Sequence, residues 1–135
     1  GSVVTYVRYG EKVDAPISDK GVADIVISFE QLEAARWLPY LKKGGTIITS
    51  TQQIDPMPVV TGAAEYPNEL VEKMKATGAN VIAADALSIA REAGNEKAVN
   101  VALIGLIEAI KMSVPEKFLE LNLKAFELGA AYSCN

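Results

Sequence analysis

The strongest constraint on the fold is a strand–helix–strand pattern between residues 21 and 51. Two runs of mainly β-branched residues, Ile25–Ile27 and Thr46–Thr49, show no alternation of polar and apolar side chains, which is typical of strands covered on both faces. Between them, apolar residues recur at every third position from Phe29 to Leu41 and predict a helix with one apolar stripe. Two parallel strands joined by a helix form a right-handed crossover. The pattern therefore predicts an α/β fold with a mainly parallel sheet.

Turn signals mark the end of this predicted helix. Pro39 disfavours helical geometry at Leu38, so we expect the helix to end near that residue. The tripeptide Lys43-Gly44-Gly45 predicts a turn into the second strand.

The N-terminal segment has the alternating pattern of a β-hairpin. Over Val3–Tyr9 one set of alternate positions holds Val3, Thr5, Val7 and Tyr9, and the other holds Val4, Tyr6 and Arg8. Val13–Ile17 continues as a returning strand that Pro16 interrupts. Proline suits an edge strand, so we predict an antiparallel hairpin at one edge of the sheet. Arg8 on this hairpin is a candidate partner-facing or substrate-facing residue, and a solvated charge on the sheet surface is the alternative.

The remainder of the chain predicts a third strand and several helices. Residues 52–66 form a long, proline-containing connection without helical periodicity. We expect Asn68 to cap a short helix that ends at Gly78, followed by a buried strand over Asn80–Ala84. Val99–Ile110 predicts a helix that is apolar on nearly every side and therefore buried, in this chain or against another.

Beyond residue 110, Ser113–Glu116 has the pattern of a capping box. It would open a last helix over Glu116–Leu128.

Composition limits the classes of function. The 135 residues, 50% of them hydrophobic, predict one globular domain over residues 1–135. A net charge of −4 without a cluster of Lys and Arg argues against a nucleic-acid partner. One cysteine, Cys134, and no histidine cannot supply the ligands of an iron–sulfur cluster or a zinc site. No segment resembles a signal peptide or a membrane span, so we expect a cytoplasmic protein without membrane contact.

Polar side chains are expected to gather where the parallel strands end, because open α/β sheets bind ligands at the carboxyl ends of their strands. Ser28 and Glu30 follow the first predicted strand, Ser50 and Thr51 end the second, and Asp85 follows the third. We predict that they form a shallow polar rim facing substrate or a partner. Without a histidine these serines cannot form a catalytic triad, and no catalytic residue is assigned. Capping of a helix is the favoured interpretation of Asp85.

Two asparagines are further candidates for contact with a ligand or a neighbouring chain. Asn95 follows Gly94, and Asn100 lies at the start of the predicted apolar helix. A turn at a helix terminus is the alternative for Asn95, and a buried hydrogen bond is the alternative for Asn100.

Five segments, taken in their order along the chain, resemble one known family. The central segment is ADIVISFEQLEAARWLPYLKKGGTIITST, and the others are GSVVTYVRYG, GAAEYP, DALSIAREAGNEKAVN and NLKAFELG. Together they resemble the gamma-type domains of the pyruvate/ketoisovalerate oxidoreductase family, which belong to the 2-oxoacid:ferredoxin oxidoreductases. Within that family the chain is most similar to the beta-subunit branch of indolepyruvate ferredoxin oxidoreductase. The ordered set is specific, and it covers almost the whole chain.

The resemblance implies a three-layer α/β sandwich with a Rossmann-like sheet. It also implies a subunit without cofactors, belonging to an enzyme that oxidatively decarboxylates indolepyruvate or another aryl pyruvate to an acyl-CoA and reduces ferredoxin. A larger partner subunit would hold thiamine diphosphate and iron–sulfur clusters and use coenzyme A, so this chain would be inactive alone.

The sequence departs from the family pattern in two places. The strand and G-x-G-G-Q-G loop with which family members usually begin are not in this sequence, so nucleotide-like binding on that loop is not carried over. The helical segment that the family has between Ile110 and Pro115 is shorter here.

Two other hypotheses belong to different classes of function. One is a non-catalytic module that binds a small anion, a nucleotide or coenzyme A at the polar rim, although no phosphate-binding glycine loop is present in the sequence. The other is a self-contained enzyme in which Glu30 and Asp85 act as an acid–base pair.

Overall fold

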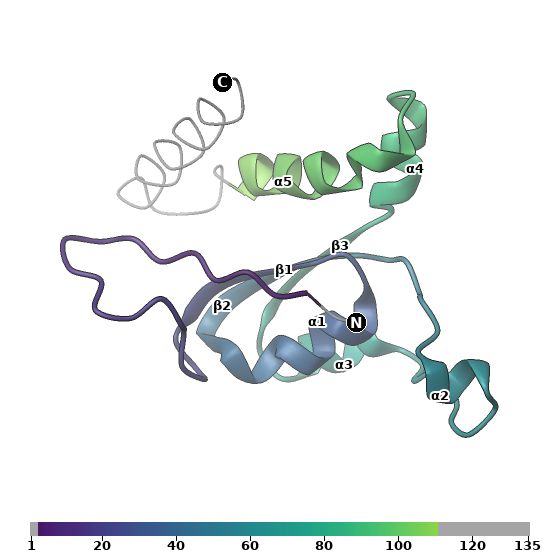
Figure 1. Cartoon of the computed structure of the whole chain (residues 1–135), viewed down its shortest axis with the longest axis horizontal. Coiled ribbons are helices and arrows are strands. Elements are labelled where there is room, and N and C mark those ends of the chain that lie inside the picture. The colour runs from purple at the N-terminus through teal and green to yellow at the C-terminus, as the bar shows by residue number, and fades with distance from the viewer. Residues whose placement is uncertain (1–2, 111–135) are drawn as a thin grey trace. The chain divides into compact units, whose positions relative to one another are not determined.

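The computed structural model describes residues 3–110, and the chain divides into two units, Gly1–Leu103 and Ile104–Asn135 (Figure 1). The described part of the second unit is the end of helix α5 (Val99–Ile110). The predicted capping box and last helix lie outside the described residues. A single domain over residues 1–135 stays a prediction.

The first unit is built on a sheet of three parallel strands. These are β1 (Ala23–Ser28), β2 (Leu41–Ser50) and β3 (Asn80–Ala84), in the order β1-β2-β3, so that β2 is central. Ile47 and Ile48 point to opposite faces of β2 and are both fully buried, as expected for a strand covered on both faces. The predicted α/β fold with parallel strands is confirmed.

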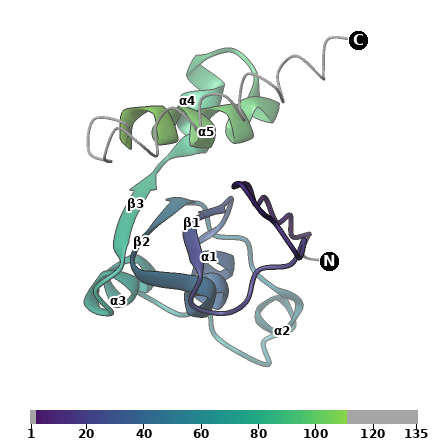
Figure 2. The ribbon, with the colours of Figure 1, turned by 90° about the vertical axis from the view of Figure 1, so that its left-hand side faces the viewer.

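Helices α1 (Gln31–Trp37) and α3 (Leu70–Ala76) pack against this sheet and against each other (Figure 2). The buried core between helices and sheet consists of Ala34, Leu41, Ile47 and Met74. Ala35 and Leu38 of the predicted stripe are partly buried against this core, whereas Phe29, which precedes α1, is exposed. A 3₁₀ turn, η1 (Leu38–Tyr40), follows α1 and contains the proline that was expected to end the helix.

The predicted turn before the second strand is a bulge inside β2. Ala23 pairs with Leu41 but Ile25 pairs with Thr46, so the register shifts across the two glycines. Gly44 has φ 75°, in the left-handed region. At Gly45 a Cβ atom would lie 2.8 Å from Leu41 Cγ, so no larger residue fits without displacement of its neighbours.

The predicted N-terminal hairpin is wrong. None of the described residues from 3 to 17 lies in a strand, although Arg8 Nη1 donates hydrogen bonds to the carbonyl oxygens of Ala15 (2.8 Å) and Ile17 (3.1 Å) and so holds the two runs together. Val3 is 92% and Val7 is 77% exposed. An isolated two-stranded ribbon is only marginally stable when its apolar side chains are not covered, so the alternating pattern alone does not produce a ladder.

The connection between β2 and β3 also differs from the prediction. Its first part contains a one-turn helix, α2 (Met57–Val60). The residue preceding α3 is Glu69, with a left-handed φ of 57° and no capping side chain, so Asn68 is not the cap. Instead, the carbonyl oxygen of Asn68 accepts a hydrogen bond from Lys73 Nζ at 2.8 Å. The predicted end of the helix at Gly78 is confirmed by its φ of 86°.

After β3, the chain forms α4 (Ala86–Glu92), the 3₁₀ turn η2 (Glu96–Ala98) and α5. The bounds of α5 are those predicted. Leu103 is fully buried, whereas Val101 is 63% exposed, so the helix is not covered on every side. No helix among the described residues combines the length and apolar character needed to cross a membrane.

Candidate functional site

The carboxyl ends of β1 and β2 hold the buried polar side chains of the described residues. Four such side chains, each at most 6% exposed, lie there: Ser28, Glu30, Thr49 and Ser50. Within the described part of the chain, every buried side-chain nitrogen or oxygen has a hydrogen-bond partner. Ser28, Glu30 and Ser50 therefore lie at the expected edge of the sheet, but their side chains bond to backbone groups and, for Glu30, to Tyr66. That this edge faces substrate or a partner stays a prediction.

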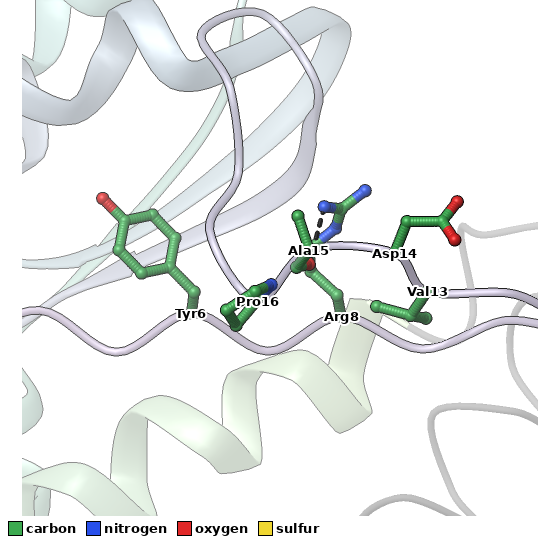
Figure 3. Close-up of a pocket in the computed structure, with 6 residues that line it drawn as sticks. All are labelled: Tyr6, Arg8, Val13, Asp14, Ala15 and Pro16. Carbon is green, nitrogen blue, oxygen red and sulfur yellow. Dashed lines mark hydrogen bonds between the residues drawn. The ribbon is translucent and has the colours of Figure 1, made fainter.

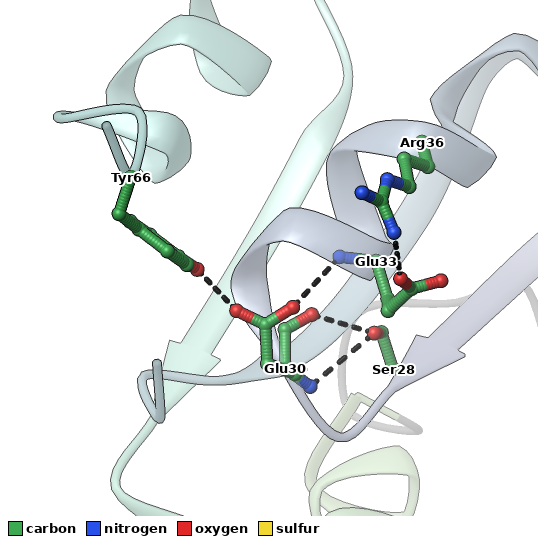
Figure 4. A network of polar contacts seen from close by, with 5 residues as sticks. All are labelled: Ser28, Glu30, Glu33, Arg36 and Tyr66. Atoms are coloured by element: carbon green, nitrogen blue, oxygen red, sulfur yellow. Dashed lines mark hydrogen bonds and ion pairs between the residues drawn. The ribbon is translucent and has the colours of Figure 1, made fainter. Parts of the chain in front are cut away.

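Glu30 is the centre of this network (Figure 4). It caps α1 at the N-terminus, where its Oε2 accepts a hydrogen bond from the Glu33 backbone N–H at 2.9 Å. Its own backbone is fixed by Ser28, whose Oγ donates to the Glu30 carbonyl oxygen at 2.7 Å and accepts from the Glu30 N–H at 3.3 Å. A carboxylate at this position also interacts favourably with the helix dipole. Glu30 therefore lies at the N-terminus of α1 and caps it.

The second oxygen of Glu30 accepts a hydrogen bond from the hydroxyl of Tyr66. Tyr66 comes from the far end of the connection after β2, 36 residues along the chain (Figure 4). Burial, followed by the hydrogen bond to Glu30 and its negative charge, raises the pKa of the Tyr66 hydroxyl well above its ordinary value. Tyr66 therefore remains a neutral hydrogen-bond donor to a carboxylate.

Gln31 fixes the other end of the same connection. Its backbone N–H donates to the carbonyl oxygen of Gln52 at 3.3 Å, and its side-chain amide donates to the carbonyl oxygen of Thr51. Ser50 Oγ accepts from the Gln52 N–H at 3.2 Å, and the Thr51 N–H donates to Ala84 of β3 at 2.9 Å. The start of α1 thus joins the end of β2, and Thr51 remains exposed.

Asp85 and Glu30 do not form an acid–base pair by their contacts, because each carboxylate caps its own helix. Asp85 accepts hydrogen bonds from Ser88 Oγ (2.7 Å) and from the Ser88 N–H (3.0 Å) at the start of α4. The hydroxyl bond first, and then the backbone bond, hold the pKa of the Asp85 carboxyl below its usual range. The predicted helix cap at Asp85 is confirmed.

The other predicted site residues lie apart from this network. Asn95 is exposed and its Oδ1 accepts from the Lys97 N–H at 3.0 Å, which makes it the cap of η2. Asn100 is exposed in α5, so the alternative of a buried hydrogen bond is wrong. Arg8 lines an open hollow of about 360 Å³ beside Tyr6 and Pro16 (Figure 3).

The polar side chains at this sheet edge hold nearby backbone segments in place, but they do not form a group of catalytic residues. The buried serines and Glu30 already have partners, and no group of three or more His, Cys, Asp or Glu within residues 3–110 could hold a metal ion. An iron–sulfur cluster needs several thiolates, and this sequence contains one cysteine. The residues present therefore do not fit such a cluster, and no electron-transfer step is assigned to them.

The family model for pyruvate ferredoxin/flavodoxin oxidoreductase matches residues 1–132. The chain belongs to this family. It is thus a component of an oxidoreductase, as the ordered segments predicted, and the family fits the parallel α/β sheet described above.

Several proteins of this oxidoreductase family are similar in sequence to the present chain over most of the chain's length. A protein of Thermococcus kodakarensis named indolepyruvate oxidoreductase subunit IorB is 40% identical, with 96% of this chain and 72% of the relative covered. Proteins of the same name from Pyrococcus horikoshii and Archaeoglobus fulgidus are 40% and 34% identical with the same coverage. The predicted resemblance to the indolepyruvate branch is confirmed.

Sequence reasoning identified Ser28, Glu30 and Ser50 in this network but missed Gln31 and Tyr66. Gln31 lies on the first turn of α1, next to the identified Glu30, so adjacency to a capping residue was an available signal. Tyr66 offered none, because a contact across 36 residues has no local periodicity.

Proposed function

We propose that the chain is the cofactor-free subunit of an indolepyruvate:ferredoxin oxidoreductase. The observation that carries this proposal is 40% identity to a protein named as a subunit of indolepyruvate oxidoreductase, over 96% of the chain. The complex would oxidatively decarboxylate an aryl pyruvate to its acyl-CoA and transfer the electrons to ferredoxin. We propose that this complex acts in the cytoplasm.

The family resemblance implies the division of labour in this complex, and the single cysteine and missing histidine of this sequence agree with it. A larger subunit would hold thiamine diphosphate and iron–sulfur clusters, which supply the carbanion chemistry and the electron transfer. The present chain contributes a rigid α/β scaffold and an interface. Its exposed candidates, Arg8, Thr51, Asn95 and Asn100, would face the partner or the coenzyme A passage. The buried Ser28, Glu30 and Ser50 would shape the sheet edge next to Thr51.

The alternative function, a module that binds a small anion, has less support. A free anion needs unpaired donors, whereas the buried hydroxyls of Ser28 and Thr49 at the carboxyl edge already donate to backbone carbonyl oxygens.

An anaerobic reconstitution tests the proposal. The tagged chain and the cognate larger subunit are purified together, and ferredoxin reduction is measured with indolepyruvate and coenzyme A, with pyruvate as the comparison substrate. We expect a coloured complex that is active with indolepyruvate, and no activity from this chain alone. Ferredoxin reduction by the isolated chain, or failure to bind the larger subunit, would overturn the proposal.

A further inference from the structure

Three large aliphatic side chains lie exposed on the connection formed by residues 52–66. Ile54 is 56%, Met57 is 69% and Val60 is 65% exposed, and they follow one another at intervals of three residues. In the same segment Pro56 and Val59 are partly buried, so the connection has an inner and an outer side. Figures 1 and 2 both show α2, which carries Met57 and Val60, projecting at the margin of the first unit.

The conformation of this connection does not depend on its exposed aliphatic side chains. Backbone hydrogen bonds close it internally: Val60 N–H donates to Pro56 O at 3.1 Å, Thr61 N–H to Met57 O at 2.9 Å, and Ala63 N–H to Pro58 O at 2.8 Å. The Thr61 hydroxyl adds a bond to Met57 O at 3.0 Å. Removing the outer side chains therefore leaves the bonds that shape the connection intact.

Both ends of the connection are fastened to the first turn of α1. Gln31 bonds to Thr51 and Gln52 at one end, and Glu30 accepts from Tyr66 at the other. A segment fixed at both ends loses little conformational entropy when it binds, which favours affinity. The aliphatic side chains are thus presented on a preorganised support.

The charged residues of this connection have one sign. Residues 52–66 contain Asp55 and Glu65 and no lysine or arginine. A surface complementary to it would be an apolar hollow with lysine and arginine at its rim. A second copy of this chain is a poor match, because each copy carries a net charge of −4.

We propose that the 52–66 connection is a docking element that inserts Met57 and Val60, with Ile54 beside them, into a basic-rimmed apolar hollow of the larger subunit. This inference rests on the proposed function for the existence of that subunit, and it deepens the function by assigning the surface that binds it.

The test compares two double variants of the full chain in binding to the purified larger subunit. Met57→Gln/Val60→Gln removes the outer aliphatic side chains. Val22→Gln/Ile89→Gln is the control, since those side chains are 48% and 45% exposed and neither belongs to the connection or to the partner-facing candidates. We expect the first to raise the dissociation constant at least tenfold and the control to change it less than twofold. Unfolding temperature of each isolated variant verifies that the chain still folds, and Ile54→Gln gives an independent single variant.

A charge variant tests the rim. Asp55→Asn/Glu65→Gln should slow association severalfold at low salt and flatten its dependence on ionic strength, with a smaller effect on dissociation.

The outcomes separate the two proposals. Failure of the wild-type chain to bind the larger subunit overturns the proposed function, and the docking assignment with it. Normal binding by a folded Met57→Gln/Val60→Gln variant, or equal weakening by the control, overturns the docking assignment alone. So does a wild-type chain that self-associates in sedimentation through these residues, because that result makes a second copy the occupant.

Discussion

Two regions of this molecule are both rich in β-branched residues but have different structures. The central strand β2 and the N-terminal run Val3–Tyr9 are both rich in β-branched residues, yet only β2 lies in a sheet. Ile47 in β2 is fully buried beneath α1 and α3, whereas Val7 is 77% exposed. Residue type sets a preference for extended backbone, and burial against other elements decides whether that preference becomes a strand.

The largest expected effect contrasts one side chain from each region. Ile47→Ala should lower the free energy of unfolding by about 2–5 kcal/mol, because it leaves a cavity in the core. Val7→Ala should change it by about 0.5 kcal/mol or less. Urea denaturation of the two variants measures both values, and similar losses would show that the N-terminal segment packs as the core does.

The bulge of β2 offers a second contrast, between neighbouring glycines. Gly45→Ala should cost up to about 3 kcal/mol, since its Cβ would lie 2.8 Å from Leu41 Cγ and 3.0 Å from the Asp24 carbonyl oxygen. Gly44→Ala has open space and only its left-handed φ to oppose it, for a cost of about 1 kcal/mol. Thermal unfolding distinguishes them, and the reverse order would contradict the tight approach at Gly45.

The hydrogen bond between Tyr66 and Glu30 lies in the buried region around the sheet, not in the exposed N-terminal segment. Tyr66→Phe should cost about 1–2 kcal/mol, because it removes the donor to a buried carboxylate oxygen. Since the pKa of Tyr66 is raised by burial and by Glu30, its contribution is fully present below the ordinary tyrosine pKa of about 10 and is lost as pH rises past the folded-state value. Subtracting the phenolate absorbance of the Tyr66→Phe variant from that of wild type isolates the ionisation of Tyr66, which should occur well above pH 10. Ionisation of Tyr66 near pH 10 would contradict its hydrogen bond to Glu30.

The smallest effect is expected at the corresponding polar contact of the exposed region. The hydrogen bonds from Arg8 to the carbonyl oxygens of Ala15 and Ile17 are exposed to solvent. Arg8→Ala should therefore lower the free energy of unfolding by about 0.5 kcal/mol or less. Protease cleavage within residues 3–17 should nevertheless become faster, while Arg8→Lys retains part of the protection. An effect on global stability as large as that of Tyr66→Phe would place this segment with the core.

The sequence was sufficient for features that depend on neighbouring residues. The β-branched runs predicted β1 and β2, Asp85 predicted the cap of α4, and apolar periodicity predicted α5 from Val99 to Ile110. The cap at Asn68 was wrong because Glu69 takes up the left-handed conformation that starts α3 instead.

Features that depend on distant partners were not predictable in the same way. The N-terminal alternation has the period of a strand, but the absence of a covering surface is a property of the whole unit. At the carboxyl edge Ser28, Glu30 and Ser50 lie at the strand ends as expected, but their bonds to backbone groups and to Tyr66 were not foreseen. The bond from Tyr66 to Glu30 depends on how the chain returns after α2, which no local pattern specifies.

The fastening of the 52–66 connection to α1 has a consequence for the order of folding. The hydrogen bonds of Gln31 to Thr51 and of Tyr66 to Glu30 join residues 20 and 36 positions apart. Both bonds require that the start of α1 is already in place at the end of β1. Loop closure over such separations is opposed by chain entropy until the crossover of β1, α1 and β2 has formed. Tyr66 should therefore have a φ-value near zero, with the crossover as the nucleus, so Tyr66→Phe should accelerate unfolding and leave the folding rate unchanged.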